Sequence, residues 1–419
     1  MRSSIPNPSY TLLISLLLSV GSLEAQSIRS GTAAEVGLSQ EALDRIAPRM
    51  QQIVDAERTG GIMTLVARDG VIAHWAAVGW RTLHEDALER TDVFRIYSMT
   101  KPIASTAVMM LVEEGRVGLD QPVGELLPRF AEVEVYDDAG RRAPTRPITI
   151  RDLLRHTSGL TYGVFGNHPV DLMYRERLQG LGRDTGMNLA ETADAIAELP
   201  LLSDPGTQWV YSLSTDVLGR VVEVASGMSF DAFLRSRIFE PLGMDDTGFH
   251  VAEHNLDRFT GQYGVRNGAL AELDSPVDGG FVRPPSWFSG GGGLTSTAMD
   301  YLRFAQMLLN DGELDGVRIL RSETVQAMRS NQLPEGHGPI PLDPNARFGL
   351  GFAVDVSEDR GGLYYWSGVA NTWFWIDPIE RIVALVWTQS DYGNPPINPL
   401  MRGLVYDAIE ESNRVPVGR

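Results

Sequence analysis

Hydrophobic and polar positions change their spacing along the chain, and the changes predict an order of elements. Near the start, apolar residues recur at helical spacing over residues 40–58, behind Ser39 as a candidate N-cap. Two β-branched and apolar runs follow, joined by an Asp-Gly dipeptide that is typical of a hairpin turn. We therefore expect one helix and then two paired strands, at residues 62–67 and 71–78.

The middle of the chain has mostly helical spacing, and strand-like runs return near its end. A capping box at residues 149–152 indicates a further helix start. The remaining expected helices cover residues 98–115, 189–199, 215–225, 229–239, 298–309 and, at the end, 399–411. Short aromatic and β-branched runs predict strands at residues 348–356, 363–366, 372–376 and 382–387.

This order predicts an α/β fold of the α+β type rather than alternating β-α-β units. Strands at both chain ends, with no helix between consecutive strands, favour one antiparallel sheet built from residues 26–115 and 345–419. Helices would flank that sheet, and residues 116–344 would form a mainly helical insertion to one side. The groove between the two parts is the expected ligand site.

The composition excludes several classes of function. The 419 residues carry a net charge of −18, and this acidic balance disfavours nucleic acid as a partner. The absence of cysteine excludes disulfides, thiolate metal sites, a cysteine nucleophile and a lipoprotein anchor.

The N-terminal segment has the features of an export signal. Arg2 precedes an apolar stretch at residues 12–20, and small-residue cleavage is possible after Ala25. The alternative, an uncleaved anchor, requires a longer apolar run than this one. We expect a signal peptide at 1–25, one large domain at 26–419, a periplasmic or secreted location and no stable membrane anchor after cleavage.

The first candidate for chemistry is Ser98-Met99-Thr100-Lys101. Pro102 is tolerated only in the first turn of a helix, so a helix that contains it must begin near Ser98. Ser98 and Lys101, three residues apart, then share one helix face. Lys101 is the only lysine among 36 basic residues. A buried lysine can lose its proton near neutral pH, whereas an arginine effectively cannot, so Lys101 is a candidate general base.

Two other segments are candidates for the same site, each with a structural alternative. Tyr211 precedes an expected helix and is a candidate third proton carrier, or simply an aromatic residue packed in the core. Residues 366–369 end a short strand whose backbone amides are suited to binding an oxyanion, or form only a strand and a turn.

In combination, the motifs resemble the penicillin-recognising serine hydrolases, and most of all the class C β-lactamase-like group that includes the family VIII carboxylesterases. The resemblance implies a β-lactamase/transpeptidase-like fold and spans nearly the whole mature chain. The matching segments are Tyr97-Ser98-Met99-Thr100-Lys101-Pro102, Leu153-Leu154-Arg155-His156-Thr157-Ser158-Gly159-Leu160, Tyr211-Ser212-Leu213-Ser214, Phe239-Glu240-Pro241-Leu242-Gly243-Met244, Gly290–Gly293 and Trp366-Ser367-Gly368.

The resemblance also implies roles for individual residues. Ser98 would be the acylated nucleophile, with Lys101 and Tyr211 as its proton network. The backbone amides of Ser98 and Val369 would form the oxyanion hole.

The chain departs from the β-lactamase pattern at two positions. Leu213 stands where those enzymes usually carry Asn, and Trp366 stands where they carry the Lys of Lys-Thr-Gly. Trp366 cannot pair with the carboxylate of a penicillin, and Trp-x-Gly resembles the esterase branch. We expect Leu213, Trp366, Ser367 and Gly368 to contact the substrate.

Three further features favour structural roles. Residues 250–254 match the zinc-protease pattern H-x-x-E-H, yet they follow a turn and lack an amphipathic pattern, so we expect a surface connection. His156 is expected to lie at a helix end with its ring near the last carbonyls, and no G-x-S-x-G nucleophile elbow is present. Gly290–Gly293 is expected to be a turn beside the cleft.

The sequence thus predicts an exported serine hydrolase that cleaves carboxylic esters through a Ser98 acyl-enzyme, with no metal and no cofactor. A small-molecule ester or amide is the expected substrate. A β-lactamase, a D-amino-acid peptidase or amidase, and an acyltransferase stay open on the same site. A non-catalytic sensor or wall-binding protein is the alternative outside the enzymes. The oligomeric state is left open.

Overall fold

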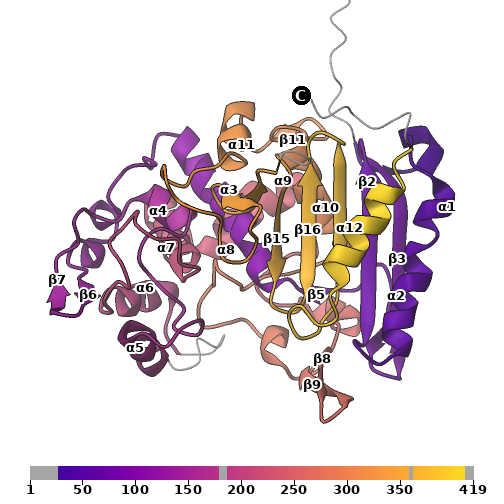
Figure 1. Ribbon diagram of the computed structural model, residues 1–419, viewed down its shortest axis with the longest axis horizontal. Helices are drawn as coiled ribbons and strands as arrows, with labels where there is room; N and C mark the ends of the chain where they lie inside the picture. The colour runs from indigo at the N-terminus through magenta and orange to yellow at the C-terminus, as the bar shows by residue number, and fades with distance from the viewer. Residues whose placement is uncertain (1–26, 179–185, 358–361, 411–419) are drawn as a thin grey trace, which may run out of the picture.

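A nine-stranded sheet forms the centre of the molecule, in a computed structural model that describes residues 27–178, 186–357 and 362–410 (Figure 1). The predicted signal peptide lies outside the described residues. The strands are β1 (Arg29–Ser30), β2 (Gly61–Arg68), β3 (Val71–Thr82), β4 (Asp86–Ala87), β13 (Ala346–Phe348), β14 (Ala353–Asp355), β15 (Tyr364–Gly368), β16 (Thr372–Asp377) and β17 (Ile382–Trp387).

The sheet joins strands from both ends of the chain, as predicted. Its order is β1-β3-β2-β17-β16-β15-β14-β13, with β4 paired to β3. The pairing of β2 with β17 connects the N-terminal hairpin to the C-terminal strands. All neighbours are antiparallel except β1, which runs parallel to β3. The β-lactamase-like sheet expected from the sequence is therefore confirmed, with one short parallel edge added.

Helices cover both faces of the sheet because its central strands are apolar on both sides. Every residue of β17 is buried. Helices α2 (Ile46–Asp55) and α12 (Ile397–Asp407) pack on one face, and α10 (Ala298–Leu309) packs on the other (Figure 1). No helix in the described ranges is long and apolar enough to cross a bilayer.

The region between the two sheet halves is mostly helical. Besides α10, its α-helices of five or more residues are α3 (Thr100–Glu113), α4 (Ile150–Leu154), α5 (Pro169–Arg177), α6 (Leu189–Ala197), α7 (Ser214–Ser226), α8 (Phe230–Leu234) and α11 (Ser322–Met328). It also contains the hairpins β6–β7 (Val135–Asp137 and Gly140–Arg142), β8–β9 (Gln262–Arg266 and Ala269–Asp274) and β11–β12 (Glu313–Leu314 and Val317–Arg318). The buried helix α3 packs against α7 and connects this region to the sheet.

Several predicted element boundaries were wrong. The helix expected over residues 40–58 is divided into α1 (Gln40–Leu43) and α2, which ends at Asp55. The strand expected over 348–356 is two short paired strands, β13 and β14, joined by a turn. The closing helix starts two residues earlier than expected, at Ile397, and ends at Asp407.

Candidate active site

Ser98 lies in a short 3-10 turn that leads into α3. The turn covers Tyr97–Met99, and the α-helix begins at Thr100, two residues later than the sequence predicted. Pro102 lies in the first turn of α3, where its missing amide hydrogen costs nothing. Tyr97 has a φ of +42°, in the left-handed region that non-glycine residues rarely adopt. The backbone is therefore strained directly before Ser98, a common feature of functional sites.

Lys101 is fully buried and makes three hydrogen bonds at the end of its side chain. Its Nζ lies 3.2 Å from Ser98 Oγ, 2.9 Å from the Tyr162 hydroxyl and 2.7 Å from the carbonyl oxygen of Gly291. The predicted meeting of Ser98 and Lys101 is thus present in the structure. The same contacts add two partners, Tyr162 and Gly291, that the sequence did not indicate.

Two of the groups around Lys101, Tyr162 and His156, keep their neutral forms. Burial, with the nearby Asp216 carboxylate, raises the pKa of the Tyr162 hydroxyl well above 10. Burial, with the charge of Lys101, lowers the pKa of His156 well below 6.5. His156 is therefore an uncharged core residue. It follows the end of α4, as expected, and its ring nitrogen Nδ1 lies 3.2 Å from Ser212 Oγ.

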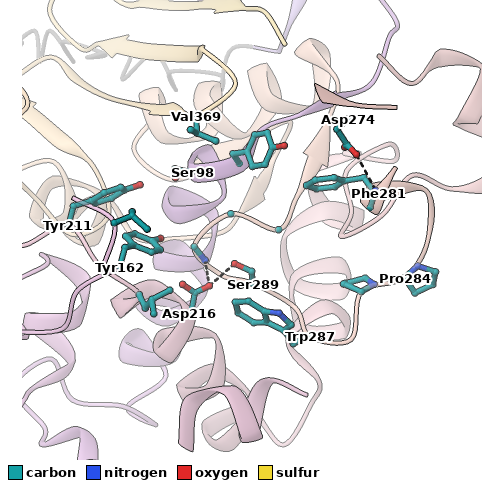
Figure 2. A pocket seen from close by; sticks show the side chains of 18 of the residues that line it. Ser98, Tyr162, Tyr211, Asp216, Asp274, Phe281, Pro284, Trp287, Ser289 and Val369 are labelled. Carbon is teal, nitrogen blue, oxygen red and sulfur yellow. Dashed lines mark hydrogen bonds between the residues drawn. The ribbon is translucent and has the colours of Figure 1, made fainter. Parts of the chain in front are cut away.

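Tyr211 meets Lys101 through its ring. The Lys101 Nζ lies 4.5 Å from the centre of the Tyr211 ring, a cation–π distance. The Tyr211 hydroxyl accepts a hydrogen bond from the Trp366 indole at 3.4 Å, and in Figure 2 its hydroxyl end is turned toward Ser98. The ring is held by aromatic neighbours on several sides, which are Trp209, His156, Tyr162, Phe165 and Trp366.

The end of β15 lies against the backbone that precedes Ser98. A side chain at Gly368 would collide with the carbonyl oxygen of Ile96, so only glycine allows this approach. A turn closed by a 3.0 Å hydrogen bond from the Asn371 amide to the Gly368 carbonyl then presents Val369 at the rim of the cleft. Val369 is 55% exposed and is drawn beside Ser98 in Figure 2.

Two cavities meet at Ser98. One has a volume of about 740 Å³ and the other about 530 Å³, and both are lined by Ser98, Phe165, Tyr211 and Val369. Leu213 lines the larger cavity. Trp366, Ser367 and Gly368 line the smaller one. All the residues expected to contact substrate therefore border the space around Ser98.

The other two segments that the sequence analysis considered lie on the surface or in the cavity wall. His250, Glu253 and His254 are exposed, and a 3-10 helix begins only at Glu253, so this segment is a surface connection as expected. The glycine run forms the predicted turn, and Gly291 to Gly293 line the larger cavity. A Cβ at Gly291 would lie 2.5 Å from Asp216 Oδ2, which explains the need for glycine there.

The fold and the S-x-x-K pair define a serine hydrolase of the penicillin-recognising type. The model of the Beta-lactamase family matches residues 46–401, which is most of the chain. The protein therefore belongs to the Beta-lactamase family.

Relatives in this family include esterases and acyltransferases. The chain is 32% identical to Esterase EstB of Burkholderia gladioli, in an alignment that covers 90% of this chain and 99% of EstB. It is 36% identical over 368 residues to Protein Rv1367c of Mycobacterium tuberculosis, with 83% and 90% covered. The solved structure of EstCE1, a hydrolase with promiscuous acyltransferase activity, matches with a TM-score of 0.76 at 26% identity, covering 88% of this chain and 99% of EstCE1.

Proposed function

We propose that the protein hydrolyses carboxylic esters through an acyl-enzyme on Ser98, with Lys101 as the base. The observation that carries this proposal is the set of acceptors around the Lys101 amine. A neutral amine has two hydrogens and one lone pair. The Gly291 carbonyl can only accept a hydrogen bond, and the Tyr162 hydroxyl accepts the other. The lone pair is then free to face Ser98 Oγ and take its proton.

Acylation follows from this arrangement. Ser98 Oγ attacks the ester carbonyl while its proton passes to Lys101. The negative charge that develops on the carbonyl oxygen is stabilised by the backbone amides of Ser98 and Val369. Tyr211, which borders both cavities, gives its hydroxyl proton to the leaving alcohol, and the proton that Lys101 took from Ser98 then restores the Tyr211 hydroxyl. Water then attacks the acyl-enzyme with the help of the same groups and releases the acid.

The wall of the smaller cavity favours neutral esters over β-lactams. Trp366 and Trp209 contribute apolar surface there, together with Leu202 and Leu342. None of these side chains can bind a substrate carboxylate. Acyl transfer is the second candidate, because an alcohol that occupies the second cavity can replace water as the acceptor. EstCE1, which shares the fold, is described as having this activity.

The test compares p-nitrophenyl butyrate with nitrocefin on the purified protein, with Ser98→Ala as the blank. We expect turnover of the ester, little turnover of nitrocefin, and a fluorophosphonate adduct located on Ser98 by mass spectrometry. Faster turnover of nitrocefin would favour a β-lactamase. A protein that forms no adduct would support a non-catalytic sensor.

We further propose that the hydrolase acts after export, as a mature chain of residues 26–419 in the periplasm or outside the cell. The signal-like composition of residues 1–25 supports this proposal. N-terminal sequencing of the protein from fractionated cells tests it. A chain that keeps Met1 and stays in the cytoplasmic fraction would exclude export.

A further inference from the structure

Asp216 is a buried carboxylate whose presence the reaction outlined above does not explain. It lies in the first turn of α7, is 1% exposed, and forms no ion pair within the described part of the chain. Burying a carboxylate without a cation in contact is costly, so such a group usually has a specific role. Asp216 also borders the larger cavity beside Ser98 (Figure 2).

Asp216 is joined to Lys101 through a single residue of the glycine turn. Asp216 Oδ1 accepts hydrogen bonds from Ser289 Oγ at 2.6 Å and from the Gly291 amide at 2.9 Å. The carbonyl of the same Gly291 accepts the 2.7 Å bond from Lys101 Nζ. The carboxylate therefore fixes the segment that holds the lysine amine.

Two opposing effects act on the charge of Asp216. Burial raises the pKa of this carboxyl group, and the charge of Lys101 opposes that effect. Both of its hydrogen-bond partners donate to Oδ1, and these donors also favour the charged form. Of the titratable groups that face Lys101, His156 and Tyr162 are neutral and Tyr211 presents its ring. Asp216 is thus the anion that balances Lys101 among the described residues.

We propose that Asp216 is a positioning residue for the esterase reaction. Through Ser289 and Gly291 it fixes the carbonyl that binds the Lys101 amine, and its charge stabilises the ammonium that forms during acylation. In that step the Ser98 O–H bond breaks and an Nζ–H bond forms. The electron pair on Oγ makes the bond to the acyl carbon, and the carbonyl pair moves to oxygen. The inference rests on the proposed function.

The principal experiment measures kcat, KM and the pH profile of Asp216→Asn. The Asn carbonyl oxygen can still accept from Ser289 and Gly291, so the loop is retained and only the charge is lost. We expect kcat to fall between about 10- and 100-fold, less than the full contribution of a general base, with little change in KM. The acid limb of the kcat profile should move to lower pH, because the ammonium that forms on Lys101 during acylation is no longer stabilised by the anion.

Three variants separate charge from structure. Ser289→Ala removes one hydrogen bond and keeps the charge, so kcat should fall without movement of the acid limb. Gly291→Ala keeps both charges but places a methyl group 2.5 Å from Asp216 Oδ2, and should lower kcat strongly. Asp300→Asn makes the same change in the first turn of α10, away from the site, and should leave kcat and the pH profile unchanged.

The outcomes distinguish the inference from the proposed function. A wild-type protein without a fluorophosphonate adduct would reject the proposed function itself. A labelled wild type, combined with an Asp216→Asn variant of unchanged kcat and unchanged acid limb, would overturn the role of Asp216 alone. If Asp216→Asn does not fold by circular dichroism, Gly291→Ala decides, and wild-type kcat in that variant would overturn the inference.

Discussion

At the scale of single residues, the site depends on the geometry of one amine. Lys101 is fully buried, and the Gly291 carbonyl can only accept a hydrogen bond from its amine, which directs one amine hydrogen away from Ser98. Arginine cannot reproduce this arrangement, because its planar guanidinium has only donors and is not deprotonated in proteins.

The first prediction is that Lys101→Arg keeps the positive charge but loses turnover. We expect kcat for p-nitrophenyl butyrate to fall by about 10³-fold or more, because no base is left to take the Ser98 proton. Circular dichroism and thermal melting check that the variant is folded. Retention of most of the activity would reject Lys101 as the base.

The second prediction separates the two tyrosines. Tyr211→Phe should lower kcat by about 100-fold, because the variant lacks the hydroxyl group that protonates the leaving alcohol. Tyr162→Phe removes a hydrogen bond to Lys101 and should cost about tenfold. Steady-state kinetics on esters with good and poor leaving groups provide the measurement. The Tyr211 effect should grow as the leaving alcohol becomes more basic, and the reverse pattern would assign that role to Tyr162.

At the scale of elements, local signals predicted the parts of the site that are close in sequence. The S-x-x-K pair was predictable because one helical turn sets its geometry and Pro102 places the helix start. Tyr162 was not predictable, since its contact with Lys101 spans 61 residues and depends on how the loop after α4 packs against α3. Asp216 was missed for the same reason, because its partner Gly291 lies 75 residues away.

The missed hairpin β8–β9 had a local signal that the sequence analysis did not use. Asn267-Gly268 connects its two strands, and both residues have positive φ, at +53° and +84°. An Asn-Gly dipeptide is a strong indicator of this turn, but the sequences of β8 and β9 lack the apolar alternation that marks a sheet. For polar hairpins of this kind, the turn residues predict the structure better than the hydrophobic pattern does.

The third prediction concerns the capping box that starts α4. Asp152 accepts hydrogen bonds from Arg146 at 2.5 and 2.9 Å, from Arg155 at 3.0 Å and from the Thr149 amide at 3.0 Å. These donors hold its pKa at about 2. Compared with about 3.9 in the unfolded chain, this shift corresponds to about 3 kcal/mol of stability at pH 7. Asp152→Asn should lose about that amount in urea unfolding.

The pH dependence of this contribution has a defined sign. Because the folded pKa lies below the unfolded one, the carboxylate stabilises the protein above pH 4, and this part of the stability is lost as the pH falls toward 2. The stability difference between wild type and Asp152→Asn should therefore shrink over that range. A stability difference that stays constant from pH 7 to pH 2.5 would show that the Asp152 carboxylate is not the source of this stability.

At the scale of the whole molecule, one buried cation connects the nucleophile turn to the far wall of the larger cavity. Arg95 lies three residues before Ser98 and is fully buried. It donates to Asp274 at 2.6 Å and to the Thr260 carbonyl at 2.5 Å, so it anchors the hairpin β8–β9. Asp274 and Phe281 line the cavity, and the Arg95 guanidinium lies 5.6 Å from the centre of the Phe281 ring.

The fourth prediction is that Asp274→Ala costs about 3–5 kcal/mol of stability, because it leaves Arg95 buried without its partner. The cavity wall should also loosen, so KM should rise more than kcat falls. Asp391→Ala is the matched control, since Asp391 pairs with Arg266 of the same hairpin at an exposed position and should cost less than about 1 kcal/mol. Urea unfolding and steady-state kinetics measure both effects. Equal losses in the two variants would mean that the hairpin is held by its surface pairs, and that the chain segment before Ser98 does not anchor the cavity wall.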